Sequence, residues 1–330
     1  MMKVIVLGEQ ARFETYTDFS QVPSHWKLLY AAGMTDDQII DAAGDAALMI
    51  ADPVRKVSGY LIEHLPNLKI IQSEGVAFNL IDLEAAQRRG IYVCNNASAN
   101  SAAVAEQIIL LILALQRRLY EGSRMVFEGR QAEAKQRFIL DGIMELGECT
   151  VGIVGLGSIG KALAKRLDAF GTKILYYKRN RLTQEEEINM NVCWRELPQL
   201  LEESDVICIC LPVTKETVNY VDAEFLNQMK PNALLINAAR GEIMDQAALA
   251  KALKENRIGG AGIDTLSPEP FTLDNPLLML PEEVREKKLI ISPHIAGTTY
   301  HVFKRMHYNC WNNLKRVAEG KIPKDIVSGL

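Results

Sequence analysis

A glycine-rich turn is the feature of this sequence that most constrains its fold. Residues 151–160 read VGIVGLGSIG and place Gly155, Gly157 and Gly160 in G-x-G-x-x-G spacing. An apolar, strand-like run precedes the turn, a helical pattern follows it, and another apolar run begins at residue 173. In such a unit the first glycine permits the tight turn and the second lets the backbone approach a pyrophosphate. The third allows the helix to pack closely on the strand.

Taken alone, this spacing is a weak signal, because glycines fall into it by chance in many chains. The flanking strand and helix patterns strengthen it, and the backbone amides near Ser158 and Ile159 would then face the phosphate at the start of the helix. A plain strand–turn–helix with packing glycines is the alternative interpretation. We favour a dinucleotide-binding unit.

Short apolar runs alternate with helical patterns along most of the 330 residues, which predicts parallel sheets with helices on their faces. One series fills the first hundred residues, and a second begins near residue 149. We therefore predict an α/β protein with two doubly wound parallel-sheet domains. The strands expected in the first series are residues 3–8, 47–52, 68–73 and 91–96.

Three further segments lie outside these two series. Residues 101–119 form a long apolar helical pattern, and a last helix over 299–319 is expected to return to the first domain. Residues 121–147 are polar and weakly patterned. They are interpreted as a long excursion, a linker, or a segment that docks on another subunit.

Composition excludes several classes of protein. A hydrophobic content of 48% argues against disorder, and a formal net charge of -4 gives no whole-molecule attraction to nucleic acid or to an anionic membrane. The most apolar long stretch is interrupted by Glu106 and Gln107, and the N-terminus lacks signal-peptide architecture, so a cytoplasmic location is expected. The six cysteines contain no CxxC pair, which favours reduced structural thiols, and no metal site is predicted.

Three polar residues follow three expected strands of the second series. Arg240 follows ALLINAA, Glu269 follows GGAGIDTLSP, and His294 follows LIISP. Ligands of open parallel sheets bind beyond the carboxyl ends of the strands, so these side chains are expected to converge. An arginine clamps a carboxylate, a histidine exchanges a proton near neutral pH, and a carboxylate orients that histidine. Taken singly, each residue also has an explanation without function: a surface arginine, a solvated glutamate, and a histidine hydrogen-bonded within a turn.

Four ordered motifs make the set specific. GLGSIG, NAARGEIMD, AGIDTLSPEP and SPHIAGTT resemble, in order and spacing, the D-isomer-specific 2-hydroxyacid dehydrogenases. The resemblance covers roughly residues 68–320. It implies a Rossmann cofactor domain, residues 101–298, inserted in a split flavodoxin-like substrate domain made of residues 1–100 and 299–330. It also implies a homodimer built on the 101–119 helix.

The resemblance assigns roles to the residues at the strand ends. Arg240 would bind the carboxylate and carbonyl oxygen of the substrate. His294 would exchange the proton, with Glu269 as its partner, and Asp264 would contact the nicotinamide carboxamide.

Other positions follow from the same resemblance. The amides around Gly75 and Val76 would hold the substrate carboxylate, and Asn100 and Val104 would line the cleft between the domains. Residues that would border the cofactor are Pro212, Thr217, Ala238 and Ala239.

The chain departs from the family pattern in its substrate loop. The family commonly has Gly-x-Gly followed by Asp-Asn, whereas this chain reads GVAFN, with Ala77 and Phe78 in place of the second glycine and the acid. Glu74 adds a carboxylate close to the expected anion site. The reaction type is unaffected, but the identity of the substrate stays open.

A basic turn, KRNR, ends the second strand of the nucleotide unit. Lys178 lies 23 residues after Gly155, near the position where an acid usually accepts the ribose 2′-hydroxyl. Lys178 and Arg179, assisted by Arg181, would instead attract a 2′-phosphate. The predicted cofactor is NADP in preference to NAD, with a solvated turn as the alternative interpretation.

These inferences predict reduction of a small 2-keto acid to the D-2-hydroxy acid, with glyoxylate or hydroxypyruvate as first choice. Oxidation of D-3-phosphoglycerate is the runner-up within the family. A catalytically silent, NAD(H)-sensing corepressor-like protein is a rival from another class. Formate oxidation is a weaker rival, because formate-oxidising relatives carry an amide at the position of Glu269.

Overall fold

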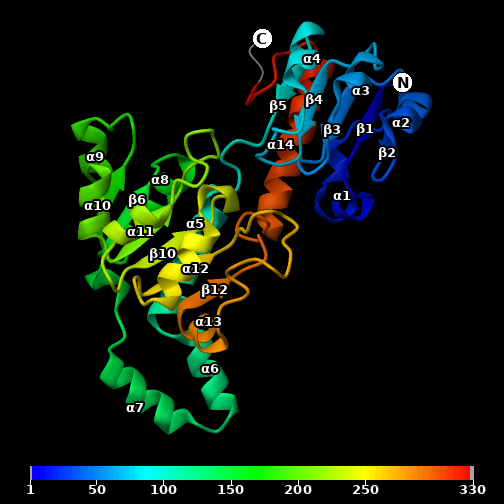
Figure 1. Ribbon diagram of the computed structural model, residues 1–330. Helices are drawn as coiled ribbons and strands as arrows, with labels where there is room; N and C mark the ends of the chain where they lie inside the picture. The colour runs from blue at the N-terminus through cyan, green and yellow to red at the C-terminus, as the bar shows by residue number, and fades with distance from the viewer. Residues whose placement is uncertain (1, 328–330) are drawn as a thin grey trace. The chain divides into compact units, whose positions relative to one another are not determined.

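The computed structural model of the chain describes residues 2–327 and divides into two compact units. Residues up to 100 join those from 298 onward in the first unit, and residues 101–297 form the second (Figure 1). Each unit is a parallel sheet covered by helices, as the alternating sequence pattern predicts.

The first unit is built on a five-stranded parallel sheet of order β2-β1-β3-β4-β5. This is the flavodoxin-like order, which confirms the predicted fold class. The strands are β1 (Lys3–Val6), β2 (Lys27–Tyr30), β3 (Leu48–Ala51), β4 (Ile70–Ser73) and β5 (Tyr92–Cys94). The helices are α1 (Gln10–Tyr16), α2 (Asp36–Ala43), α3 (Gly59–Glu63), α4 (Leu83–Arg88) and α14 (Tyr300–Ala318).

Side-chain alternation along the strands divides the core of the first unit into two layers. Ile5 of β1 packs in the layer formed with α2, α3 and α4. Val4 and Val6, on the opposite face of the same strand, pack in the layer that contains Phe13 of α1 and Trp311 of α14. Successive side chains of a strand point to opposite faces, so apolar residues at every position suit a sheet covered on both sides.

Strand β2 was not predicted from the sequence. Its residues KLLY are exposed or half-buried, because β2 is the edge strand and pairs only with β1. A half-exposed edge strand of four residues lacks the continuous apolar run that marks the central strands.

The second unit contains a seven-stranded sheet of order β12-β11-β10-β9-β6-β7-β8, in which every pairing is parallel. Read from the other edge, this is the Rossmann order with one added strand. The strands are β6 (Thr150–Val154), β7 (Lys173–Tyr177), β8 (Cys193–Trp194), β9 (Val206–Ile209), β10 (Leu234–Asn237), β11 (Gly260–Ile263) and β12 (Leu289–Ile291).

Helices cover both faces of this sheet (Figure 1). The layer with α5 and α8 contains Ile108 and Leu163, and the layer with α10, α11 and α12 contains Leu200, Phe225 and Leu249. The helices are α5 (Ser101–Gln116), α6 (Leu119–Phe127), α7 (Gln131–Asp141), α8 (Ser158–Asp168), α9 (Gln184–Met190), α10 (Leu197–Glu203), α11 (Ala223–Gln228), α12 (Gln246–Lys254) and α13 (Glu282–Lys288).

The weakly patterned segment 121–147 is largely helical. The expected 101–119 helix ends at Gln116, and Arg118 takes a left-handed conformation with φ 49° before α6 begins. Helices α6 and α7 form a hairpin that extends away from the sheet of the second unit (Figure 1). Ion pairs between Arg118 and Asp141 and between Arg137 and Glu121 hold the hairpin together.

Two properties of the chain bear on its environment. Among residues 2–327, no helix is both long enough and apolar enough to cross a lipid bilayer. The six cysteines are free thiols, and burial raises the pKa of Cys94 and of Cys210 to about 12.

Candidate active site

The carboxyl edge of the second sheet brings together the ends of β10, β11 and β12. Asn237 pairs with Ile263, which pairs with Ile291, so the three strands end in register. Arg240, Glu269 and His294 lie in the segments that directly follow these strands. Loops beyond the carboxyl ends of parallel strands are where ligands of doubly wound sheets bind.

Glu269 and His294 are in direct contact. His294 Nδ1 lies 2.7 Å from Glu269 Oε2, and the two side chains are 41% and 40% exposed. The pair is therefore open to a small molecule. With Nδ1 donating to the carboxylate, the other ring nitrogen, Nε2, is left to exchange a proton.

His294 has an unusual backbone conformation, with φ 55° in the left-handed region. Such a conformation persists only where the surroundings hold it. Asp264, at the end of β11 and 1% exposed, supplies that support. Its Oδ1 accepts hydrogen bonds from Ser292 Oγ at 2.5 Å and from the Ile295 amide at 3.1 Å. Its Oδ2 accepts from the Ala296 amide at 2.9 Å.

Asp264 therefore acts on the site through the turn that carries His294. Ser292 is anchored a second time, because Gln107 Nε2 of α5 donates to its hydroxyl at 3.1 Å. The predicted contact of Asp264 with the nicotinamide carboxamide stays a prediction, and both of its oxygens already accept hydrogen bonds from the 292–296 turn.

Arg240 lies at the same edge and is exposed. Its Nη1 donates to the Ala239 carbonyl at 2.7 Å, and its own carbonyl accepts from Asn237 Nδ2 at 3.0 Å. Within the described residues, Arg240 makes no hydrogen bond with Glu269 or His294. Gly241 lets the two loops meet, because a Cβ there would lie 2.2 Å from the Leu266 carbonyl carbon.

The glycine turn lies at the point where the strand order of the second sheet reverses, between β6 and β9. Gly155 has φ 98°, and a Cβ there would lie 2.6 Å from the Cys210 carbonyl oxygen. Gly160 packs as closely, with its Cβ position 2.4 Å from the Gly155 oxygen. A Cβ on Gly157 would meet nothing within 4 Å, so that glycine borders open space.

These residues fit the pyrophosphate of a dinucleotide. Gly157 is the N-cap of α8 and provides no side-chain cap, and a helix N-terminus of this kind suits a phosphate. Ser158 is exposed and Ile159 is half-buried.

The other residues predicted to border the cofactor differ in accessibility. Thr217 Oγ1 donates to the Pro212 carbonyl at 2.7 Å and so closes the loop that follows β9. Val104 is 4% exposed and lies in the same apolar layer as Ala238. Ala239 is also buried.

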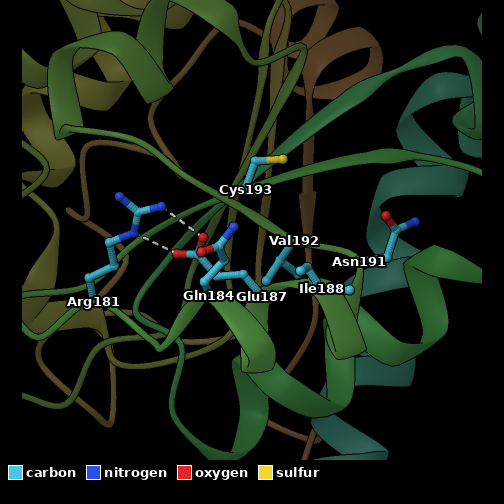
Figure 2. A pocket seen from close by; sticks show the side chains of 7 residues that line it. All are labelled: Arg181, Gln184, Glu187, Ile188, Asn191, Val192 and Cys193. Atoms are coloured by element: carbon cyan, nitrogen blue, oxygen red, sulfur yellow. Dashed lines mark hydrogen bonds and ion pairs between the residues drawn. The ribbon is translucent and has the colours of Figure 1, made fainter.

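The three cations of the basic turn after β7 differ in their contacts. Arg181 is paired with Glu187 of α9, with Nε and Nη2 each 2.8 Å from a carboxylate oxygen (Figure 2). This bidentate hydrogen bonding lowers the pKa of Glu187, and the guanidinium also lies 5.2 Å from the centre of the Trp194 ring. Lys178 and Arg179 make no hydrogen bond with any residue in the described part of the chain.

The predicted substrate loop follows β4 in the first unit. Asn96 Nδ2 donates to the carbonyls of Ser73 and Glu74, and the Asn96 amide donates to the Gly75 carbonyl. Asn95 Nδ2 donates to the Val76 carbonyl at 2.7 Å. The loop carbonyls are thus turned toward the protein.

The amides of the same loop mostly lack a hydrogen-bond partner within the described residues. The Gly75 amide donates to Ser73 Oγ at 3.3 Å, while no hydrogen bond within residues 2–327 engages the amide of Val76 or Ala77. Asn100, the last residue of this stretch of the first unit, is half-buried, and its role stays a prediction.

Sequence reasoning missed the partners of Glu74. The carboxylate is 2% exposed, and it accepts hydrogen bonds from Arg12 of α1 and from His307 of α14. Neither partner lies in a recognisable motif. The polar pair Asn95–Asn96, directly after an apolar strand, was a sequence signal that could have predicted hydrogen bonds to the loop that contains Glu74.

The fold and the site together define a doubly wound, dinucleotide-binding dehydrogenase. Comparison with known proteins identifies the family. Residues 109–296 match the family model of the D-isomer specific 2-hydroxyacid dehydrogenase NAD binding domain. The chain belongs to this family, an oxidoreductase family that acts on CH–OH groups with a nicotinamide cofactor.

Curated relatives and solved structures agree with this membership. Glyoxylate reductase of Thermofilum pendens is 39% identical over 83% of this chain and 78% of its own, and that of Pyrococcus furiosus is 34% identical over 88% and 85%. D-lactate dehydrogenase of Aquifex aeolicus, solved with NAD and lactic acid, is 27% identical. It covers 99% of both chains with a TM-score of 0.81.

Replacing Asp264 by Asn should destabilise the second unit. The amide retains one acceptor oxygen, so at least one charge-assisted hydrogen bond to the His294 turn is lost, at a cost of about 1.5–3 kcal/mol. Urea unfolding measures the change. Asp274→Asn, which neutralises an exposed carboxylate of the same unit, is the control, and its effect should stay below about 0.5 kcal/mol. Equal stability of the two variants would contradict the anchoring role.

Proposed function

We propose that this protein reduces glyoxylate or hydroxypyruvate to the corresponding D-2-hydroxy acid, with His294 as proton donor. The observation that carries the proposal is the 2.7 Å contact between His294 Nδ1 and Glu269 Oε2 at the carboxyl edge of the Rossmann sheet. The glyoxylate reductases among the relatives support this substrate class.

The residues divide the chemistry between them. The bound nicotinamide cofactor supplies the hydride. Glu269 orients the His294 imidazole through its contact with Nδ1, and Nε2 delivers the proton to the carbonyl oxygen. Arg240 aligns the substrate through two parallel hydrogen bonds to its carboxylate. The alternatives are an enzyme that oxidises D-3-phosphoglycerate and a catalytically silent NAD(H) sensor. Turnover measurements on 2-keto acids and on D-3-phosphoglycerate distinguish them.

His294→Asn tests the proton donor. Asparagine tolerates the left-handed conformation at this position, so the variant should fold. Turnover of glyoxylate should fall roughly 100- to 10,000-fold, the usual contribution of general acid–base catalysis.

The matched control is His25→Asn, which changes an exposed histidine of the first unit and should leave turnover unaltered. Near-normal turnover in His294→Asn would refute the assignment. An unaltered protein that binds cofactor but reduces no 2-keto acid would favour the sensor.

We further propose a preference for NADPH, based on Lys178 and Arg179. Both side chains are without a hydrogen-bond partner in the described residues, and no acid occupies the ribose position at the end of β7. Arg181 is paired with Glu187, so the proposed preference rests on the other two cations of the turn.

Arg179→Asp should lower kcat/KM for NADPH about 10- to 100-fold, since one charge-assisted hydrogen bond is worth about 1.5–3 kcal/mol. The value for NADH should change little. Arg181→Gln is the control, because its guanidinium serves Glu187, and it should leave the ratio of the two cofactors within about twofold. Equal efficiency of the unaltered protein with NADPH and NADH would overturn the proposed preference.

We also propose that the protein is a homodimer that uses α5 and the α6–α7 hairpin. Apolar side chains gather there without cover from their own chain: Leu110, Leu119, Tyr120, Val126, Phe127, Ile139 and Leu140 are all more than half exposed. Exposed apolar surface of this kind marks protein–protein contacts.

Sedimentation should show a particle of twice the 36.8 kDa chain mass. Phe127→Asp should shift the protein toward the monomer, because it places a charge among apolar side chains. Ile188→Asp, at another exposed apolar position, on α9, should not. A monomer in the unaltered protein at micromolar concentration would rule the dimer out.

A further inference from the structure

An ion cluster lies where the strand order of the first sheet reverses, between β1 and β3. In doubly wound sheets this crevice at the carboxyl ends is the usual ligand position. Here the chain fills it with its own side chains. Arg12 reaches Asp52, which follows β3, and Glu74, which follows β4. Gly8 makes room, because a Cβ there would lie 2.8 Å from Arg12 Nη2 and 3.0 Å from Glu74 Oε2.

Within this cluster, the Arg12 guanidinium compensates the buried negative charge of Glu74. Arg12 donates from Nε to Glu74 Oε1 at 2.8 Å and from Nη2 to Glu74 Oε2 at 2.5 Å, and the same Nη2 donates to Asp52 Oδ2 at 2.7 Å. Glu74 is 2% exposed, and a buried carboxylate is retained only when it is paired and hydrogen-bonded. Bidentate pairing also fixes geometry.

A second arm reaches Glu74 from the last helix. His307 of α14 is fully buried, and its Nε2 lies 3.0 Å from Glu74 Oε1. Its Nδ1 lies 2.9 Å from Thr17 Oγ1, which accepts from Trp311 Nε1 at 3.2 Å. The Phe13 ring stacks on the imidazole at 4.4 Å. Hydrogen bonds at both ring nitrogens and the stacked Phe13 ring therefore fix the orientation of His307.

Glu74 directly precedes the loop whose amides are predicted to hold the substrate carboxylate. Asn95 and Asn96 donate hydrogen bonds to carbonyls of Val76 and Glu74. The Glu74 side chain, at the start of the loop, binds Arg12 of α1 and His307 of α14. Together these contacts hold the amides of Val76 and Ala77 in one arrangement.

We propose that Glu74 is a positioning residue, which Arg12 and His307 hold so that the 74–78 loop presents a preformed anion site to the 2-keto acid. This role rests on the proposed function. It does not require Glu74 to touch the substrate, and it explains a carboxylate next to an anion site, because the Arg12 guanidinium offsets its charge.

Glu74→Gln tests the proposal, with glyoxylate and NADPH as the probes. The loss of charge-assisted hydrogen bonds should raise KM for glyoxylate about 10-fold. The values of kcat and of KM for NADPH should stay within about twofold. Asp52→Asn is the matched control. It removes another acceptor of Arg12 but lies outside the loop, and it should change KM for glyoxylate less than about twofold.

Hydrogen exchange provides a readout that is independent of activity. Amides 75–80 should exchange faster in Glu74→Gln than in Asp52→Asn or in the unaltered protein. An unchanged KM for glyoxylate, or equal loop exchange in the two variants, would overturn the proposal.

Should Glu74→Gln fail to fold, His307→Phe is measured in the same way, because it removes one donor to Glu74 while filling the ring volume. Faster exchange in the loop supports the proposal, and unchanged exchange overturns it. If the unaltered protein turns over no 2-keto acid, the proposed function fails, and the exchange measurement still decides whether Glu74 anchors the loop.

Discussion

The buried carboxylate of Asp264 is the constraint on which the active-site edge of the second unit depends. It accepts three hydrogen bonds from the turn that carries His294, and that turn adopts a backbone conformation that histidine rarely takes. The turn places the imidazole Nδ1 2.7 Å from Glu269 Oε2. The proposed proton exchange would therefore begin from a geometry that the fold already provides.

Most of this site was predictable from the sequence, because the carboxyl ends of parallel strands meet at one edge of a sheet. The segments after three successive strands had to meet at one edge, so Arg240, Glu269 and His294 were expected together, and the structure places Glu269 and His294 in contact. The glycine turn was equally predictable, because its spacing and flanking patterns agree. Family membership confirms the reaction class but leaves the roles of these individual residues to experiment.

Other features could not be predicted, since they depend on contacts between distant segments. Arg12 lies 62 residues from Glu74, and His307 lies 233 residues away. From the sequence alone, Glu74 was therefore only a carboxylate close to the expected anion site. The ion pair of Arg181 was missed for a related reason. Its partner Glu187 is six residues away and on the next helix, so the three basic residues of the turn looked equivalent.

The left-handed backbone at position 294 favours residues other than the histidine proposed to donate the proton. A glycine there would adopt φ 55° without steric cost, and asparagine would do so more readily than histidine. Sequence optimisation for thermal stability would thus tend to replace the proposed proton donor. A consensus or computational redesign of this chain should hold position 294 constant and seek its gains elsewhere.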